Sequence, residues 1–487
     1  MIDTAALRKK ILDFAIEGKL SKRDCKNNTC ELFELIQKEK EYQLKNGLLK
    51  KTKAFSKITQ DKIPGDFPKE WYICYIDDIA FVTKLAGFEY TKYIADNIQN
   101  EGIPLFKGKN VQHGELVLEF ESFIPHSISD ELPRSQLKKK CLLTPYVGTI
   151  GNIAIFEGEF DAHLGSNVGK IELLNSDKEK YLLEEYVLYY LRSSYGYAEL
   201  TKHKKATAQD SISIEAIRNV ILPIPSLEEQ REIVNRVNEI LEQIELIDDF
   251  QAQYSSDLEV LKSKIIDAGI QGKLTEQLPE DGTAEELLEQ IAKEKKQLIK
   301  EKKIKATKAL PEITEDEIPF EIPNNWKFVR LGDVLNEIIV PQRDKPKVFD
   351  GNIPWCRIED AEGIYLRRSL SNQNVSQATV DKMNLRVCPK GTILSACSGA
   401  SIGRILITES ELCTNQTFNG LVCSSGLYNK YLFYYMNHMI DKLRKMGTGA
   451  AMAYISQDKT AKMVIPFPPY NEQVRIVDKI DRIMDLI

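Results

Sequence analysis

Residues 7–20 read LRKKILDFAIEGKL, and residues 261–274 read LKSKIIDAGIQGKL. The two stretches share eight identities in fourteen positions at an offset of 254. A second stretch, ELFELIQKEK at residues 31–40, returns as ELLEQIAKEK at residues 286–295. Internal repeats of this kind indicate one architecture that is built twice. Because the segments between the repeats diverge, we expect a fixed helical frame that holds two different recognition modules.

Two shorter motifs recur in the same order. One has the form Ile-Pro…Pro…Trp, and its copies are Ile63-Pro64 with Pro68 and Trp71, and Ile318-Pro319 with Pro323 and Trp326. The other has the form Pro-x-Pro…Glu-Gln. Its first copy is Pro223 and Pro225 with Glu229-Gln230, and its second copy is Pro466 and Pro468 with Glu472-Gln473. Each pair of motifs encloses one insert, so the frame is predicted to begin and end each insert in the same way.

Composition narrows the class of protein. The chain has 487 residues, of which 43% are hydrophobic and 28% charged, as in an ordinary soluble globular protein. We find no apolar run of the roughly 18 residues that a membrane helix needs, and the amphipathic start with its acidic residues does not resemble a signal peptide. We therefore expect a cytoplasmic protein. The net charge of −6 does not exclude DNA binding, because local basic surface sets phosphate affinity.

The metal-binding residue types show no pattern. The nine cysteines include no CxxC pair, and the five histidines have no spacing typical of metal ligands. We therefore expect reduced thiols and no metal site.

A heptad pattern runs through the centre of the chain. From Glu228 onward apolar residues recur at alternating steps of four and three over roughly forty residues, which is typical of a coiled-coil helix. Ser226 and Glu229 form a capping box at its start, and Gly269 or Gly272 can end it. The apolar positions are Ile233, Val237, Ile240, Ile244, Ile247, Tyr254, Leu258, Leu261, Ile265 and Ala268.

The partner of this helix is predicted to come in two pieces. The C-terminal residues Ile476, Ile480, Ile483 and Ile487 copy Ile233 to Ile244, whereas Leu7, Ile11 and Phe14 copy Leu261 to Ala268. We expect the central helix to pack antiparallel against these two pieces laid end to end, in a pseudo-twofold, circularly permuted arrangement. An ordinary buried helix would explain the heptads but not the split repeat.

The predicted fold class is α+β, with two α/β inserts joined by the antiparallel pair of long coiled-coil helices. Second helices are expected at residues 31–44 and 283–303, and helices with an aromatic stripe at 185–192 and 430–439, where the aromatic rings belong to the core. Strands are expected at residues 115–120, 141–144, 153–156, 392–395, 404–408 and 421–423.

Basic clusters lie beside glycine-containing loops of both inserts. The loop Gly148 to Gly151 pairs with the loop Ala400 to Gly403. A run of charges is usually a solvated face, but four clusters near Gly, Ser and Thr loops favour contact with phosphates. The clusters are Lys138 to Lys140, Lys202 to Lys205, Arg367 with Arg368, and Lys442, Arg444 and Lys445 before Gly447.

No constellation of catalytic residues is apparent. The string Phe467-Pro468-Pro469-Tyr470 lacks the Asn or Asp that an amino-methyltransferase motif needs at its first position. We find no phosphate-binding loop, no nuclease pattern and no Ser/His/Asp set in the sequence. We therefore predict no catalytic residue, no metal site and no cofactor in this chain.

These motifs resemble the specificity subunit of type I restriction-modification systems over essentially the whole chain. The resemblance rests on the repeated LxxxIxDxxIxGKL helix, the two Pro-Trp motifs, the two Glu-Gln motifs and the segments Ser401 to Gly403 and Asn415-Gln416. It implies target-recognition domains near residues 65–225 and 320–468, each reading one half of a split DNA site. The helical frame would then comprise residues 1–60, 226–310 and 470–487.

The resemblance also implies partners. Two modification subunits would dock on the frame and methylate adenines with S-adenosylmethionine, and restriction (motor-nuclease) subunits would add cleavage that depends on ATP and Mg²⁺. The first insert departs from the pattern, because it has Leu164 to Asn167 where the second has Asn415-Gln416. Base contacts therefore cannot be transferred from one insert to the other.

We expect fourteen side chains to contact DNA, the Arg and Lys residues at phosphates or guanine and the Gln residues at adenine. They are Lys107, Lys109, His163, Lys204, Lys205, Gln209, Trp355, Arg357, Ser398, Arg404, Gln416, Lys445, Thr448 and Tyr454.

A helix of about 40 residues spans roughly 60 Å, so it could act as a ruler between half-sites. Two other readings stay open: an orphan DNA-binding or anti-restriction protein, and a coiled-coil scaffold that never touches DNA.

Overall fold

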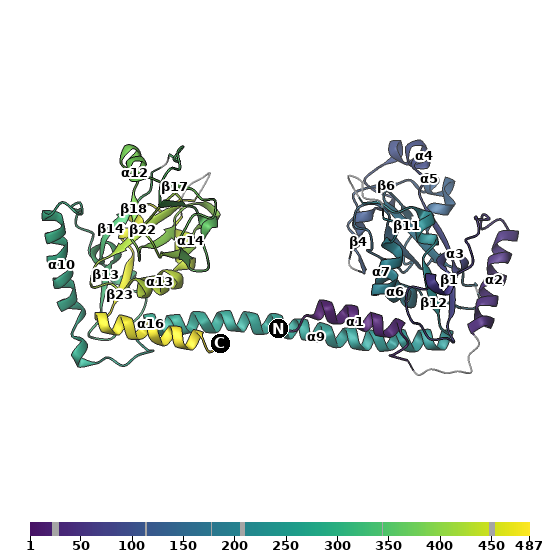
Figure 1. Cartoon of the computed structure of the whole chain (residues 1–487), viewed down its shortest axis with the longest axis horizontal. Coiled ribbons are helices and arrows are strands. Elements are labelled where there is room, and N and C mark those ends of the chain that lie inside the picture. Colours follow the sequence, from purple (N-terminus) through teal and green to yellow (C-terminus); the bar gives the residue numbers. More distant parts are fainter. Residues whose placement is uncertain (22–28, 113, 177, 205–209, 343, 448–452) are drawn as a thin grey trace. The chain divides into compact units, whose positions relative to one another are not determined.

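The computed structural model describes residues 1–487 except 22–28, 113, 177, 205–209, 343 and 448–452 (Figure 1). The chain folds as two compact units, unit 1 (Met1–Ala252) and unit 2 (Gln253–Ile487). The long helix α9 (Leu227–Ile270) begins in unit 1 and ends in unit 2, which confirms the predicted central helix. In the described ranges no helix is long and apolar enough to cross a membrane.

In unit 1 the N-terminal helix α1 (Thr4–Ile16) packs antiparallel on the first part of α9. At one end the Thr4 hydroxyl donates to Asp248 at 2.5 Å, and at the other end the Ser21 hydroxyl donates to Glu229 at 2.8 Å. Arg8 adds an ion pair with Asp248 at 2.7 Å. The predicted antiparallel pairing is therefore confirmed for this unit.

In unit 2 the C-terminal helix α16 (Tyr470–Met484) packs antiparallel on the last part of α9. Glu472 near its start accepts a hydrogen bond from the Thr275 hydroxyl at 3.3 Å, just beyond the end of α9. Further along, the side chains of Ile476 and Ile480 lie 3.0 Å from where a β-carbon on Gly269 would be. Gly269 is thus inside the helix, and Gly272 is the glycine that ends it.

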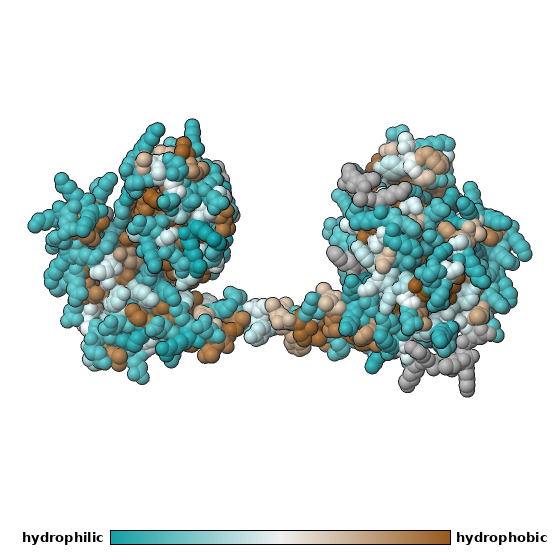
Figure 2. Space-filling model, in the orientation of Figure 1, coloured by the Kyte–Doolittle hydropathy of each residue, from teal (hydrophilic) through white to brown (hydrophobic). Residues whose placement is uncertain are grey.

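The predicted apolar seam is buried only in part. Ile233, Val237 and Ile244 are 0–2% exposed beneath α1, whereas Tyr254 is 59% exposed and Leu261 is 44% exposed. The physical reason is coverage, because the start of α1 reaches α9 at Gln251 and α16 contacts it around Gly269. The apolar face of α9 is therefore uncovered in the middle of the helix, where hydrophobic surface is visible beside α1 (Figure 2).

In the described residues each unit carries two small sheets and a strand pair, and unit 1 has a second pair, β4 (Val111–Gln112) with β5 (Glu115–Leu116). In unit 1 the main sheet has the order β2-β11-β8-β9, the second has the order β6-β3-β10-β7, and β1 pairs with β12. The strands are β1 (Tyr72–Tyr75), β2 (Ala80–Lys84), β3 (Ile103–Phe106), β6 (Phe123–Ile124), β7 (Gln136–Leu137), β8 (Cys141–Pro145), β9 (Ala154–Phe156), β10 (Ala162–Leu164), β11 (Val168–Leu173) and β12 (Ile221–Ile224).

Unit 2 repeats this arrangement with one further strand, β16, at the edge of its main sheet. The orders are β14-β22-β19-β20-β16 and β17-β15-β21-β18, and β13 pairs with β23. The strands are β13 (Lys327–Arg330), β14 (Leu335–Ile339), β15 (Ile353–Cys356), β16 (Tyr365–Leu366), β17 (Asn374–Val375), β18 (Val387–Cys388), β19 (Ile393–Ala396), β20 (Ile405–Thr408), β21 (Leu412–Thr414), β22 (Phe418–Cys423) and β23 (Val464–Phe467). The predicted strand at residues 115–120 is wrong beyond β5 (Glu115–Leu116), because the Asn110 amide donates to the carbonyls of Val117 and Glu119.

The helices of the two units also correspond. Unit 1 has α2 (Thr29–Lys45), α3 (Ile76–Ile79), α6 (Glu184–Arg192), α7 (Ser194–Thr201) and α8 (Ile214–Arg218); unit 2 has α10 (Ala284–Lys300), α11 (Leu331–Val334), α13 (Asn429–His438), α14 (Ile440–Met446) and α15 (Gln457–Ala461). Tyr186 on α6 and Tyr431 on α13 are fully buried and donate to the carbonyls of Pro223 and Pro466. The aromatic stripes therefore belong to the core, as predicted.

The repeated motifs contact one another. Gly18 and Gly272 end their helices with φ near +70° (+67° and +69°), a conformation that side chains with a β-carbon rarely adopt. A β-carbon there would also lie only 2.7 Å from Pro68 or 2.5 Å from Pro323. The helix motif thus ends against the Pro…Trp motif, and this close approach explains why glycine is present in both copies.

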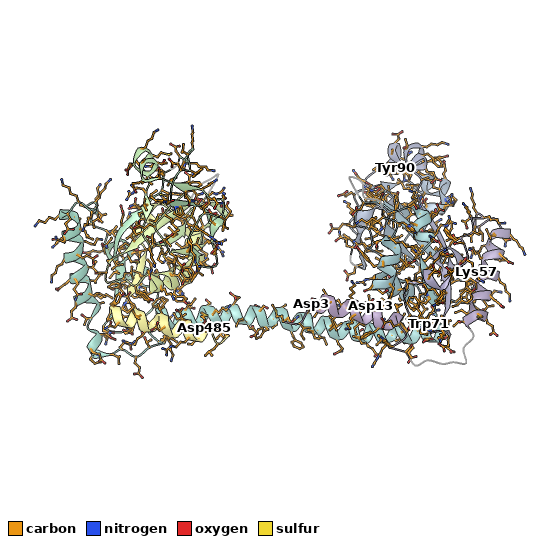
Figure 3. The ribbon with its side chains drawn as sticks, viewed as in Figure 1. Asp3, Asp13, Lys57, Trp71, Tyr90 and Asp485 are labelled. Atoms are coloured by element: carbon orange, nitrogen blue, oxygen red, sulfur yellow. The ribbon has the colours of Figure 1, made fainter. Side chains whose placement is uncertain are left out.

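The Trp and Glu-Gln motifs join each insert to the frame. The Trp71 indole donates to Glu229 at 2.9 Å, and the Trp326 indole donates to Glu472 at 2.8 Å. Asp13 of α1 accepts hydrogen bonds from the backbone and hydroxyl of Ser194 at the start of α7. Asp13 and Trp71 lie between the helical frame and the sheets of unit 1 (Figure 3). The Trp–Glu bond is therefore common to both units, whereas Asp267, the counterpart of Asp13, contacts His438 Nδ1 instead.

Candidate nucleic-acid interface

Three loops of unit 2 meet beside the ends of β15, β19 and β21. The backbone amide of Asn415, after β21, donates to the carbonyl of Cys356 at the end of β15. The Cys397 amide donates to Thr417 at 2.7 Å, and Ser398 forms a bridge with Tyr454. These contacts bring together Arg357, Ser398, Gln416 and Tyr454, four of the predicted DNA-contacting residues.

Arg404 and Lys445 lie on neighbouring parts of the same surface. Arg404 ends the β19–β20 loop, because its carbonyl accepts from the Ala396 amide at 2.9 Å. The preceding Gly403 lies against α14, with Arg444 Nε 3.5 Å from the position of a β-carbon. Both Arg404 and Lys445 are exposed, and neither side chain makes a hydrogen bond or ion pair with the described residues. Their charges are therefore available to a phosphate.

Unit 1 builds the corresponding loops from different residues. The Gly108 amide donates to the carbonyl of Ser166 at 3.1 Å, and the Tyr146 amide donates to Asn167 at 3.0 Å. The Gly148 amide donates to Asp210, as the Gly399 amide donates to Ala453 in unit 2. The loop after β8 (residues 146–153) and the loop after β19 (residues 397–404) are equally long but differ in sequence.

Lys107 and Arg357 occupy equivalent positions. The register of β3 with β10 and of β15 with β21 aligns Leu105 with Trp355, and so Lys107 with Arg357. Lys107 Nζ donates to the Ser122 hydroxyl at 2.8 Å, and Arg357 donates to the Ser371 hydroxyl at 3.4 Å. Both units therefore place one cation at the same point of the candidate surface.

Two predicted contacts are buried. His163 on β10 is fully buried, its Nδ1–H donates to the Leu164 carbonyl, and burial lowers the pKa of its imidazole. Trp355 is 4% exposed and packs with Val375, Val380 and other apolar residues, as its counterpart Leu105 does in unit 1. These positions correct the expectation that His163 and Trp355 touch DNA, because the strand alternation points both inward.

The other cations of unit 1 have partners. Lys109 pairs with Glu121, whose pKa it lowers, and both side chains are largely exposed. Lys204 lies 2.5 Å from Asp210, and this hydrogen bond raises the pKa of the lysine. Phosphate contact would therefore have to replace an exposed ion pair, which carries little energy in water. The predicted residues Lys205, Gln209 and Thr448 lie outside the described residues.

Sequence reasoning missed aromatic residues beside the loops of unit 1. Tyr197 on α7 is 48% exposed, and its ring lies 2.3 Å from where a β-carbon on Gly151 would be. Lys84 lies 4.2 Å from the ring centroid of Tyr146. Exposed aromatic and basic side chains together are suited to contact nucleic acid. The signal available in the sequence was the pairing of Gly151 with Gly403, which marks where a neighbouring helix approaches.

The match to a known family follows the repeat. The family model for the type I restriction modification DNA specificity domain matches residues 68–253 and again residues 323–487. The chain belongs to this family. Each match begins at the Pro…Trp motif and continues into the helix after the Glu-Gln motif, so the specificity domain includes the contacts that hold an insert on its helix.

Curated relatives of this specificity-domain protein cover nearly the whole chain. Over 98% of its length it is 26% identical to the EcoAI and 23% identical to the EcoEI type I restriction enzyme specificity subunit, both from Escherichia coli, and covers 88% of each. It is also 25% identical to the putative MjaX specificity subunit of Methanocaldococcus jannaschii, over 87% of this chain and 89% of that protein. The resemblance to type I specificity subunits is therefore confirmed.

A solved structure supports the fold. A chain from a structure of a type I R-M system, described as concerning its complex assembly and conformational transition, superimposes with a TM-score of 0.57 at 18% identity. The superposition covers 86% of the specificity-domain chain and 91% of the solved chain. At this identity the match establishes the fold only.

Proposed function

We propose that this specificity subunit reads a bipartite DNA site, with unit 1 recognising one half and unit 2 the other. One observation carries the proposal: the same loops meet twice, in the same topology, but present different side chains. Ser166 of unit 1 occupies the position of Gln416 in unit 2. Tyr197 packs against Gly151 in unit 1, whereas Ile440 packs against the equivalent Gly403 in unit 2. Equal frames with unequal loops are what two different half-sites require.

The side chains divide into positioning and reading groups. Arg404 and Lys445 have free charges for phosphates, which supply affinity and dependence on salt. Gln416 is exposed and can offer the paired donor and acceptor that adenine presents in the major groove. Arg357 can contact guanine or phosphate from the equivalent position of Lys107. The buried strands beneath hold these loops in fixed geometry.

The helical frame has a separate role in this proposal. Helix α9 carries one unit at each end, so its length sets the spacer between the half-sites. Modification subunits dock on the frame and supply S-adenosylmethionine chemistry, and restriction subunits supply ATP- and Mg²⁺-dependent cleavage. The described residues include no group of three or more side chains suited to hold a metal ion. In this proposal the chain contributes recognition and assembly, and catalysis belongs to the partner subunits.

A methylation map tests the proposal. The chain is expressed with its modification subunit in a host that lacks DNA methylation, and methylated adenines are located across the genome. We expect one split motif with a spacer of fixed length. Methylation at a continuous motif, or none although the two proteins associate, would contradict the proposal and favour an orphan DNA binder or a scaffold.

A further inference from the structure

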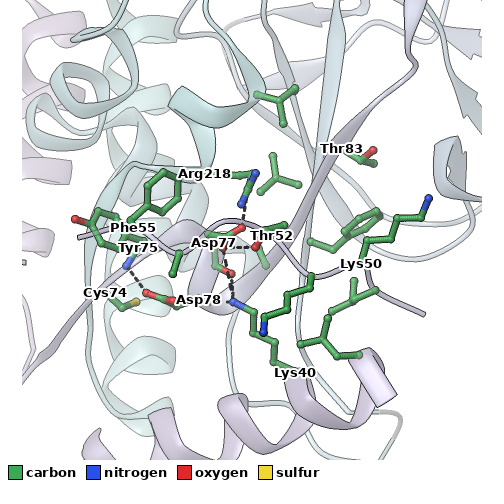
Figure 4. Close-up of a pocket in the computed structure, with 18 of the residues that line it drawn as sticks. Lys40, Lys50, Thr52, Phe55, Cys74, Tyr75, Asp77, Asp78, Thr83 and Arg218 are labelled. Carbon is green, nitrogen blue, oxygen red and sulfur yellow. Dashed lines mark hydrogen bonds and ion pairs between the residues drawn. The ribbon is translucent and has the colours of Figure 1, made fainter. Parts of the chain in front are cut away.

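A pocket of about 760 Å³ lies in unit 1, and of the residues named above beside the candidate DNA loops only Lys84 lines it. Its walls come from α2, the segment 49–58, the β1–α3–β2 stretch and α8 (Figure 4). Its volume is within the range of sites that hold small molecules. Apolar side chains form part of the wall, among them Phe33, Leu44 and Phe55. The pocket can therefore enclose a ligand that has an apolar part.

The lining carries an excess of positive charge. Seven cationic side chains face two carboxylates, those of Asp77 and Asp78. The cations are Lys40, Lys50, Lys51, Lys57, Lys84, Arg134 and Arg218. In a chain whose net charge is −6, such a local excess marks a surface that attracts anions.

The two carboxylates are already engaged. Asp77 accepts from Arg218 Nε at 2.6 Å and from the Thr52 hydroxyl at 2.9 Å, and Lys40 Nζ lies 3.8 Å from it (Figure 4). Asp78 accepts from the backbone amide of Tyr75 at 3.0 Å. By contrast, Arg218 Nη2 is buried and has no hydrogen-bond partner among the described residues. A buried guanidinium N–H without an acceptor costs free energy unless a ligand or water supplies one.

Unit 2 provides an internal comparison. The stretch 31–64 aligns with 286–319 without a gap, and α3 and α8 align with α11 and α15. At five of the seven cationic positions unit 2 has no cation: Ala306, Glu312, Ile339, Leu385 and Ala461 replace Lys51, Lys57, Lys84, Arg134 and Arg218. The two cations that persist are Lys295 and Lys305, in place of Lys40 and Lys50.

The base of the pocket is also filled in unit 2. Gly332 replaces Asp77, and a β-carbon there would lie 2.9 Å from Leu310 and 3.1 Å from Ala461. Leu310 in turn replaces Phe55, which in unit 1 lies beneath the Arg218 guanidinium at 5.6 Å. The Asp77–Arg218 pair is therefore absent from unit 2. That unit joins the same segments with packed apolar side chains and with Arg330, whose guanidinium donates to the carbonyls of Pro311, Glu312 and Lys462.

We propose that the unit 1 pocket binds a small organic phosphate, with the phosphate at the lysines of segment 50–57 and Arg218 and its organic part against Phe55 and Leu44. The cations supply charge-assisted donors for phosphate oxygens. An organic phosphate should bind more tightly than inorganic phosphate, because inorganic phosphate would leave the apolar wall in contact with water. This site lies outside the loops assigned to DNA and does not depend on their role.

Isothermal titration calorimetry on the full chain tests the proposal with AMP, adenosine and inorganic phosphate as probes. We expect AMP to bind more tightly than inorganic phosphate, and adenosine to show no binding. Lys51→Ala/Lys57→Glu, which installs the residues of unit 2, should weaken AMP binding by about tenfold or more, on the scale of one to two lost charge-assisted bonds. A second variant, Asp77→Gly/Arg218→Ala, should weaken AMP binding to a similar extent. It installs the residues that unit 2 has at these positions, Gly332 and Ala461.

The matched control is Lys305→Ala/Lys308→Glu, which removes the same charge from the corresponding linker of unit 2. It should leave AMP binding unchanged. Equal loss in the control would mean that AMP responds only to net charge, and this would overturn the proposal. Absence of AMP binding by the unmodified chain would overturn it as well. Neither result bears on the split DNA motif, which is measured separately.

Discussion

The hydrogen bond between Trp326 and Glu472 predicts how strongly unit 2 depends on one carboxylate. Glu472 is fully buried and accepts from the Trp326 indole at 2.8 Å, from the Gln277 amide at 2.9 Å and from the Thr275 hydroxyl at 3.3 Å. Glu472→Ala removes all of these acceptors. The indole N–H of Trp326, a residue only 3% exposed, is then buried without a partner.

The magnitude follows from the number and burial of these bonds. A hydrogen bond to a charged group contributes about 1.5–3 kcal/mol, and a buried unpaired donor costs about 1–3 kcal/mol. We therefore expect Glu472→Ala to lower the free energy of unfolding of unit 2 by about 3–5 kcal/mol. The matched change is Glu229→Ala, where the carboxylate is half-buried and, among the described residues, accepts side-chain hydrogen bonds only from Trp71 and Ser21. Its cost to unit 1 should be about 1–2 kcal/mol.

Hydrogen exchange measured by mass spectrometry on the full chain separates the two effects. Glu472→Ala should reduce protection in β13, β23 and α16 and leave β1 and β12 unchanged, and Glu229→Ala should do the reverse. Glu472→Gln keeps an oxygen acceptor, so it should reduce this protection less than Glu472→Ala does. If Glu229→Ala costs as much as Glu472→Ala, or if either change alters both units equally, the reasoning from local contacts is refuted.

Three further predictions concern pH, DNA and the long helix. Burial lowers the pKa of His163, so the unfolded chain binds its proton more readily; the stability of unit 1 should fall as the pH drops below 6.5, and His163→Gln should weaken that dependence in denaturant titrations. Arg404→Ala and Lys445→Ala should each reduce the slope of log affinity against log salt by about one, while exposed Lys303→Ala should not change it. Inserting seven residues between Leu246 and Leu258 lengthens α9 by about 10 Å, so the spacer should grow while both half-sites stay the same. An unchanged spacer would contradict the hypothesis that the length of α9 sets the spacer.

The frame could be predicted from the sequence because each of its motifs occurs twice. The heptad of α9, the glycines Gly18 and Gly272 and the Trp and Glu-Gln motifs all satisfy backbone or packing demands that local sequence expresses. The heptad pattern predicted an apolar face along α9, but the middle of that face is exposed, because coverage depends on how far α1 and α16 reach along the helix. Periodicity shows which face is apolar, but the neighbour decides whether that face is buried.

The contact residues were harder to predict. Lys107 and Arg357 were chosen separately and occupy equivalent positions, since both follow a buried strand at the same edge. His163 and Trp355 were also chosen beside those strands, but the alternation of side chains turns them into the core. The pocket in unit 1 could not be predicted, because it joins residues from four segments. Its difference from unit 2 appears only when the two units are aligned, as at Arg218 with Ala461 and Asp77 with Gly332.

The central claim is that unit 1 and unit 2 read separate halves of one DNA site. Residues 65–225 are exchanged for those of a relative with a different specificity, and methylated adenines are mapped in a methylation-free host that also expresses the modification subunit. The account predicts that one half of the motif changes while the other half and the spacer stay the same. A change in both halves, or in neither, would contradict it.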